Sequence, residues 1–141
     1  MLILDPDTPL PAGALVWPNT TDVTAHADAL AAAPAVVLEF PKWTDGRAYS
    51  QAVVLRGRLR FAGEIVARGE VVRDMLPLLR RCGFDAVLLA DGEDRAAALR
   101  AASELPAPFP SHYQGDARQP LPRFARAGRG GSFAPAPGTP R

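Results

Sequence analysis

Residues 41–50 hold the densest group of side chains that could do chemistry. They stand between an apolar run and a segment of helical periodicity, so Thr44 or Asp45 can cap a helix that begins near Gly46. The free N–H groups at the start of a helix attract anions, and glycine leaves room for a ligand beside the backbone. Arg47 can grip an oxyanion with two parallel hydrogen bonds. The residues predicted to bind a small anion are Lys42, Gly46, Arg47, Ser50 and Arg73.

A second polar group follows the next predicted strand and includes Arg73 and Asp74. Ligands of open parallel α/β sheets bind beyond the carboxyl ends of the strands, so both groups are expected on one rim. Asp45 and Asp74 are the candidates for a general acid or base there. The catalytic role stays open, because no nucleophile–base pair is recognisable. In the structural alternative Asp45 caps the helix, Arg47 and Asp74 form ion pairs, and Tyr49 packs in the core.

The chain lacks the common sequence motifs of cofactor and metal sites. Its single cysteine, Cys82, excludes an internal disulfide and a four-cysteine iron–sulfur or metal site. It has no dinucleotide-binding glycine pattern, Walker loop, His-Glu-x-x-His or Gly-x-Ser-x-Gly motif. His26 and His112 lie far apart in the sequence without an obvious partner. We therefore expect no metal and no tightly bound flavin, haem or iron–sulfur cluster.

Short apolar runs alternate with segments of helical periodicity along the chain. The predicted strands are 14–17, 35–40, 63–67 and 86–89, and a fifth is considered near 109–113. The first predicted helix is capped by one of the residues 20–22 and stops at Pro34. The others run from 46 to 60, from 71 to 82 and from 93 to 105. This alternation is typical of an α/β fold with about four to five mostly parallel strands. The sheet is expected to be open and three-layered or barrel-like, with both faces covered because the strands are apolar on both sides.

Three features of the helices lead to further expectations. Pro77 falls inside the third helix, which either kinks there or begins near Leu76 after a short first turn. Gly83 is expected to end that helix in a left-handed conformation. The residues of the second helix expected to face inward are Tyr49, Ala52, Val53 and Leu59, and those expected to be solvated are Arg56, Arg58 and Arg60.

The chain of 141 residues is expected to form a single α/β domain over 1–115 and a disordered tail over 116–141. From Gly115 onward, ten of 27 residues are Gly or Pro, which is unfavourable for a packed core. From Arg118 to the end the chain carries five arginines and no acidic residue, whereas the rest has 11 basic and 15 acidic residues. An acidic body argues against nucleic-acid binding. The sequence has no apolar run long enough to span a membrane and no signal peptide, so we expect a cytoplasmic protein.

Three stretches of the chain, 40–50, 63–74 and 80–86, resemble a known bacterial family. The combination of Asp-Gly-Arg-x-Tyr-Ser at 45–50 with Arg-Cys-Gly-Phe-Asp at 81–85 is similar to the domain of unknown function family 934. The resemblance covers about residues 14–115. The residues that match the family pattern are Lys42, Asp45, Gly46, Arg47, Tyr49, Ser50, Arg73 and Asp74. The chain departs from it at Val66, Glu70, Pro77 and Val87, and the first two of these are expected to touch the rim.

This resemblance implies a link to sulfite reduction in assimilatory sulfur metabolism, as an oxidoreductase or an accessory protein. Because one cysteine cannot hold a four-cysteine cluster, we expect an accessory component that serves sulfite reductase or another sulfur-assimilation protein. One alternative is a stand-alone enzyme that binds a small anionic substrate at the rim, with sulfite or sulfate as first candidates. The other alternative is a non-catalytic interaction module with a docking tail.

Overall fold

The computed structural model describes residues 1–105 of the chain. Three expectations therefore lie outside the described residues: the strand near 109–113, the domain boundary at 115 and the disordered tail over 116–141. Within residues 1–105, no helix combines the length and the apolar composition that a membrane crossing requires.

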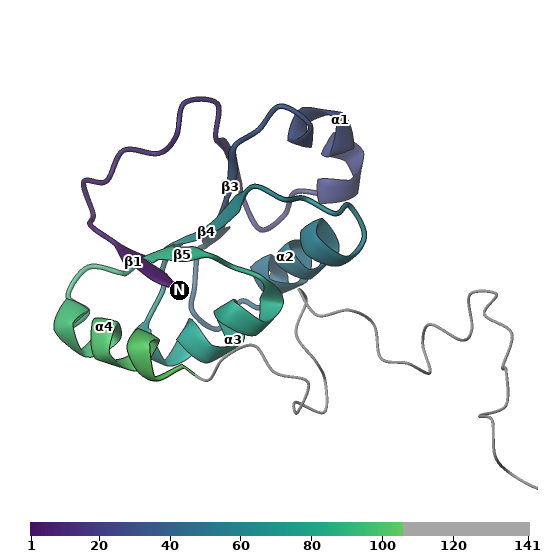
Figure 1. The fold of residues 1–141 in the computed structure, drawn as a ribbon. Coiled ribbons are helices and arrows are strands. Elements are labelled where there is room, and N and C mark those ends of the chain that lie inside the picture. The colour runs from purple at the N-terminus through teal and green to yellow at the C-terminus, as the bar shows by residue number, and fades with distance from the viewer. Residues whose placement is uncertain (106–141) are drawn as a thin grey trace, which may run out of the picture.

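Five parallel strands form one open sheet (Figure 1), which confirms the predicted α/β class. The strands are β1 (Leu2–Leu4), β2 (Leu15–Trp17), β3 (Ala35–Phe40), β4 (Glu64–Gly69) and β5 (Ala86–Leu88). Their spatial order is β1-β5-β4-β3-β2, so β2 to β5 are neighbours in chain order and β1 lies at the far edge beside β5. The four predicted strands are present, and the fifth described strand comes from the start of the chain.

Helices connect the strands from β2 onward. They are the 3-10 helix η1 (Val23–His26), α1 (Ala27–Leu30), α2 (Arg47–Gly57), the 3-10 helix η2 (Arg73–Met75), α3 (Leu76–Cys82) and α4 (Arg95–Glu104). Each crossover moves one strand in the same direction, so the right-handed rule places the helices on one face of the sheet. On that face Leu55, Leu79 and Ala98 from the helices share a buried core with Leu38 and Ile65 from the strands.

The opposite face of the sheet is covered by a loop. Val37, Val66 and Ala86 are buried there, and Leu10 packs against them. Leu10 belongs to the connection 5–14, which runs between the two edge strands β1 and β2. Both faces are thus covered at the centre of the sheet, as the apolar strands predicted, but in the described residues no layer of helices lies on this second face.

The helices begin and end at residues that favour helix boundaries. Asp22 precedes η1, and its Oδ1 atom accepts a hydrogen bond of 2.9 Å from the Thr24 N–H. Pro77 lies in the first turn of α3, where its missing N–H costs nothing. The second of the two expectations for Pro77 is therefore right, since η2 supplies the short first turn. Gly83 ends α3 with a φ of 101°, as predicted.

Two side chains of α2 differ from expectation. Val53 is exposed, because the buried stripe of this helix runs through Ala48, Ala52 and Leu55 and leaves Val53 on the outer side. Arg56, predicted to be solvated, keeps only 8% of its side chain exposed.

The Arg56 guanidinium binds the chain segments around it. It donates hydrogen bonds to the carbonyl oxygens of Phe61 at 2.7 Å, Gly63 at 2.8 Å and Gly83 at 3.0 Å. It also forms an ion pair with the Asp85 carboxylate. The turns before β4 and β5 present these carbonyl oxygens to the Arg56 side chain, which a sequence pattern does not reveal.

Candidate functional site

The carboxyl ends of all five strands lie at one edge of the sheet, because the strands are parallel. The segments that follow β2, β3, β4 and β5 therefore meet on one rim, as the sequence predicted. Val66, expected to touch this rim, lies inside β4 and is buried on the second face instead. Glu70 does lie on the rim, where its Oε2 atom accepts a hydrogen bond of 3.2 Å from the Trp43 N–H.

At the start of α2, the Asp45 carboxylate takes the place that was predicted for an anion. Its Oδ1 atom accepts hydrogen bonds from the Arg47 N–H at 3.2 Å and from Arg47 Nε at 3.0 Å. Its Oδ2 atom lies 2.6 Å from Arg47 Nη2. These bonds from Arg47 hold the pKa of Asp45 well below its ordinary value of 3.8. The helix begins after Gly46, as expected, but Gly46 itself is the N-cap and neither Thr44 nor Asp45 takes that position. Arg47 forms an ion pair, as in the structural alternative, and its partner is Asp45.

A buried asparagine stands beside this pair. Asn19 follows β2, is only 6% exposed and helps to lower the pKa of Asp45. Its Nδ2 atom is buried without a hydrogen bond of ordinary geometry. On either side of Asn19 in the sequence, the carbonyl oxygens of Pro18 and Thr21 accept hydrogen bonds of 3.0 Å and 2.9 Å from Nε2 of Gln51 in α2. Gln51 ties the loop after β2 to α2, and no pattern in the sequence had indicated that role.

The remaining predicted site residues lie on the rim at greater exposure. Lys42 is exposed, and its carbonyl oxygen accepts a bond of 3.0 Å from the Asp45 N–H. Ser50 is exposed on α2. Arg73 lies in η2 with its Nε atom 3.5 Å from Asp74 Oδ1, and the Asp74 side chain is 87% exposed. In residues 1–105 no hydrogen bond or ion pair joins the two candidate acid–base groups Asp45 and Asp74.

A hollow of about 700 Å³ opens on the helix side of this rim, and we call it the outer hollow. Its lining residues are Trp43, Thr44, Tyr49, Val72, Asp74, Met75, Leu78 and Glu93. Trp43 is 59% exposed and Leu78 is 44% exposed. Asp74 and Glu93 are carboxylates, and no lysine or arginine lines the hollow. The outer hollow is therefore apolar, with an acidic border.

The floor of the outer hollow is fixed by the core. Tyr49 packs edge-on against Phe40 at 5.1 Å between ring centroids and lies at 6.4 Å from Phe84. Burial raises the pKa of Tyr49 to about 12, so its hydroxyl stays protonated at neutral pH. The Met75 sulfur accepts a hydrogen bond of 3.4 Å from the Val72 N–H, which holds the start of η2 beneath the hollow. These contacts leave Trp43 and Leu78 as the lining apolar residues with the most exposed surface.

A second hollow, of about 630 Å³, opens on the loop side of the rim, and we call it the inner hollow. Its lining residues are Pro6, Phe40, Pro41, Arg68, Gly69, Glu70, Leu88, Leu89, Ala90 and Asp91. Arg68 forms an ion pair with Glu39 across β3 and β4, at a Nη2–Oε1 distance of 2.5 Å. Arg68 is the one cation among the lining residues of the inner hollow. Because it is paired with a carboxylate, the lining has no unpaired positive charge.

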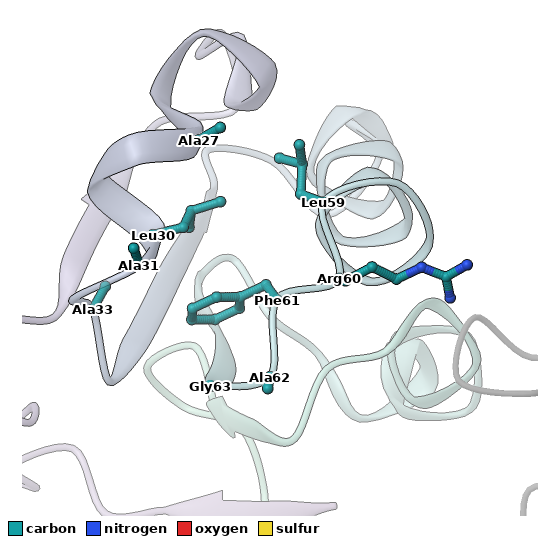
Figure 2. Close-up of a pocket in the computed structure, with 9 residues that line it drawn as sticks. All are labelled: Ala27, Leu30, Ala31, Ala33, Leu59, Arg60, Phe61, Ala62 and Gly63. Atoms are coloured by element: carbon teal, nitrogen blue, oxygen red, sulfur yellow. The ribbon is translucent and has the colours of Figure 1, made fainter.

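A third hollow, of about 450 Å³, lies at the opposite end of the sheet, between α1 and the turn before β4. Figure 2 shows Leu30 and Phe61 facing each other across it, while the Arg60 side chain points away. Arg60 has a positive φ of 57°, which turns the chain sharply after α2. Apart from Arg60, its lining residues are glycine, alanine, leucine and phenylalanine, which offer no acid, base or nucleophile.

No arrangement of three or more His, Cys, Asp or Glu side chains that could ligate a metal occurs in residues 1–105. The rim residues of the outer hollow supply a tryptophan face, an apolar floor and carboxylates. Such a surface suits contact with a protein or an apolar group better than proton transfer at a reacting centre. Trp43, Leu78 and Glu93 were not among the predicted site residues, because their exposure depends on where the helices pack.

Comparison with known proteins agrees with the resemblance seen in the sequence. No curated protein and no solved structure matches the chain. A family model described as "Bacterial protein of unknown function (DUF934)" matches residues 14–124. That match covers most of the folded strands and helices and extends 19 residues past Leu105. The chain therefore belongs to this family of bacterial proteins of unknown function.

Proposed function

We propose that this protein is an accessory component of sulfite reduction in assimilatory sulfur metabolism and that it binds its partner protein at the outer hollow. The observation that carries the proposal is Trp43, which is 59% exposed above an apolar floor. Tryptophan is the residue most enriched at the energetic centres of protein interfaces. An exposed apolar group with a polar border is the kind of surface that marks such contacts.

The geometry of the predicted acid–base groups favours binding over catalysis. Asp45 forms an ion pair with Arg47, and its lowered pKa makes its carboxylate a weak proton acceptor. Asp74 is almost fully exposed, where water competes with any substrate contact. The link to sulfite reduction rests on the family resemblance of the rim residues. A chain with one cysteine would rely on its partner for an iron–sulfur cluster with four cysteine ligands.

Binding of the full chain to the purified haem and iron–sulfur subunit of sulfite reductase tests this proposal. Calorimetric titration should give a complex with the wild type, and Trp43→Ala should weaken it by roughly 30-fold, as for an interface hot spot. Val53→Ala, which shortens an apolar side chain on the outer side of α2, is the control and should bind as the wild type does. Equal binding by Trp43→Ala and the wild type would exclude the outer hollow as the docking surface.

A second candidate function is the binding of a small oxyanion at the start of α2, which would serve an enzyme with an anionic substrate. Asn19 favours it, because its buried Nδ2 atom has no hydrogen bond of ordinary geometry and lies beside the Asp45 carboxylate. Arg47 contributes two further kinds of donor, its backbone N–H and its guanidinium. In this arrangement the Asp45 carboxylate is an internal anion that sulfite or sulfate would have to displace.

Removal of that internal charge tests the oxyanion site. Because the pKa of Asp45 is lowered, the carboxylate stays charged at neutral pH and opposes an anion. Asp45→Asn should therefore bind sulfite or sulfate at least roughly tenfold more tightly than the wild type, and Arg47→Ala should bind more weakly. Arg58→Ala removes an exposed arginine at the other end of α2 and serves as the control. If Asp45→Asn shows no binding at anion concentrations on the order of millimolar, the site does not exist.

A further inference from the structure

The chain leaves the neighbouring strands β1 and β5 towards opposite faces of the sheet (Figure 1). After β1 it enters the connection 5–14, whose Leu10 packs on the second face. After β5 it leads to α4, whose Ala98 belongs to the core on the helix face together with Ile3 of β1. In an open parallel sheet, such a divergence leaves a crevice outside the carboxyl ends of the two strands, and ligands bind there.

The inner hollow lies at this crevice. Its lining includes Pro6, two residues after the end of β1, and residues 88–91, which end β5 and lead on from it. Phe40, Pro41 and residues 68–70, from the ends of β3 and β4, complete the lining. The volume of about 630 Å³ lies within the range of small-molecule sites, which is about 300–1,000 Å³.

Hydrogen bonds between the segments around the inner hollow hold its walls in place. Arg95, the first residue of α4, donates a bond of 2.9 Å to the Leu4 carbonyl oxygen and pairs with the Asp5 carboxylate at 3.0 Å. The Ala90 N–H after β5 donates a bond of 2.9 Å to the Val71 carbonyl oxygen after β4. The crevice is therefore formed without a ligand, as is usual for small-molecule sites.

The charges of the inner hollow favour a cation over an anion. Arg68 is paired with Glu39, and two further carboxylates, Glu70 and Asp91, line the hollow. One oxygen of Glu70 accepts the Trp43 N–H. Within residues 1–105 the Asp91 carboxylate has no hydrogen bond or ion pair. One positive and three negative charges thus leave a net charge of −2, and the carboxylate of Asp91 is available to a ligand.

We propose that the inner hollow binds a small organic cation, an amine or guanidinium joined to an apolar body. The cationic group pairs with the Asp91 carboxylate, and the apolar body packs against Pro6, Pro41 and the half-buried Leu88 and Leu89. The apolar body displaces water around the ion pair, which strengthens the attraction. The inner and outer hollows share no lining residue, so this inference does not depend on the partner proposed for the outer hollow.

A nuclear magnetic resonance titration of the isotope-labelled full chain with phenethylammonium tests the site. At probe concentrations on the order of millimolar, we expect shifts of the amide signals of Gly69 and of residues 88–91. Phenethyl alcohol has the same ring and chain without the charge and should bind at least roughly fivefold more weakly. Hydrocinnamate, which carries the opposite charge, should leave these signals unchanged.

Asp91→Asn removes the charge and keeps the shape of the side chain, and it should weaken phenethylammonium binding by roughly fivefold. Asp28→Asn removes an exposed carboxylate on α1, outside the lining of the inner hollow, and should bind as the wild type does. Equal affinities of the two variants, or of the amine and the alcohol, would overturn the proposal. So would the absence of binding, or shifts confined to the lining residues of the outer hollow. No partner protein is present, so the result is independent of the docking experiment.

Discussion

At the residue scale, Arg56 shows how one buried cation organises the amino-end edge of the sheet. Its guanidinium satisfies the carbonyl oxygens of Phe61, Gly63 and Gly83 and the carboxylate of Asp85. Asp85 Oδ2 in turn accepts a hydrogen bond of 2.8 Å from the Ile65 N–H at the start of β4. The pair therefore fixes the register at which α2 leads into β4 and α3 leads into β5.

Arg56→Met should destabilise the fold by about 3–5 kcal/mol, because it removes the cation that pairs with the Asp85 carboxylate and the hydrogen bonds to three carbonyl oxygens. Methionine keeps the apolar stem, so the loss reports the charge and hydrogen bonds rather than packing. Arg58→Met, two residues further along and exposed, should change the free energy of unfolding by less than about 0.5 kcal/mol. Urea denaturation of both variants measures the difference. Similar values for the two variants would mean that the Arg56 contacts contribute nothing.

Alanine substitutions at Gly69 and Gly92 distinguish the cost of backbone strain from the cost of a steric clash. Both glycines have a positive φ, but only at Gly69 would an added Cβ atom meet other atoms. At Gly69 φ is 110° and a Cβ atom would lie 2.3 Å from the Phe40 carbonyl oxygen. At Gly92 φ is 84° and nothing lies within 4 Å. Gly92→Ala should cost about 1–2 kcal/mol from backbone strain alone. Gly69→Ala should cost roughly 1–3 kcal/mol more, because the backbone around the rim has to shift. Chemical denaturation decides, and equal losses would contradict the close contact with Phe40.

At the scale of elements, α4 depends on a carboxylate at its first turn. The Asp94 Oδ1 atom accepts a hydrogen bond of 2.9 Å from the Ala97 N–H. This backbone bond is the largest cause that holds the pKa of Asp94 below its ordinary value of 3.8. Since the folded value is the lower one, the stabilisation is present above pH 3.8 and is lost as the pH falls below it.

Asp94→Ala should therefore lower the urea midpoint at neutral pH, and the gap to the wild type should narrow in acid. Asp91→Ala is the matched control, because Asp91 is exposed in the same loop and caps none of the described helices. A gap that stays constant as the pH falls through 3.8 would show that Asp94 does not act through its charged form.

The strands and helices were largely predictable because their patterns are local. Apolar runs such as 35–40 and boundary residues such as Gly83 specify an element without reference to the rest of the fold. β1 was not predicted, because no helix follows it before β2 and it therefore falls outside the alternation of strands and helices that revealed the other strands. The strand order was not predictable either, since β1 pairs with β5 over more than 80 residues of sequence. The exposure of Val53 likewise depends on where α2 packs.

At the scale of the whole molecule, the rim was predictable and its contacts were not. Parallel strands bring the loops after β3 and β4 together, so the location of Asp45, Arg47 and Asp74 followed from the strand pattern. The pairing of Asp45 with Arg47 needs coordinates, because either residue could have turned towards a ligand. The exposure of Trp43 above Met75 also needs coordinates. Our proposal that the rim is a docking surface rests on this exposure.

Leu78 and Leu99 allow the most direct test of the docking surface. Both are leucines on helices, with 44% and 46% of their surface exposed, but only Leu78 lines the outer hollow. Serine at either position removes a similar apolar area, so the two variants should have similar stability. The decisive measurement is the dissociation constant of each full-length variant with the haem and iron–sulfur subunit of sulfite reductase. We predict that Leu78→Ser weakens binding by about tenfold or more and Leu99→Ser does not. Equal affinities of the two variants, or no binding by the wild type, would contradict the account.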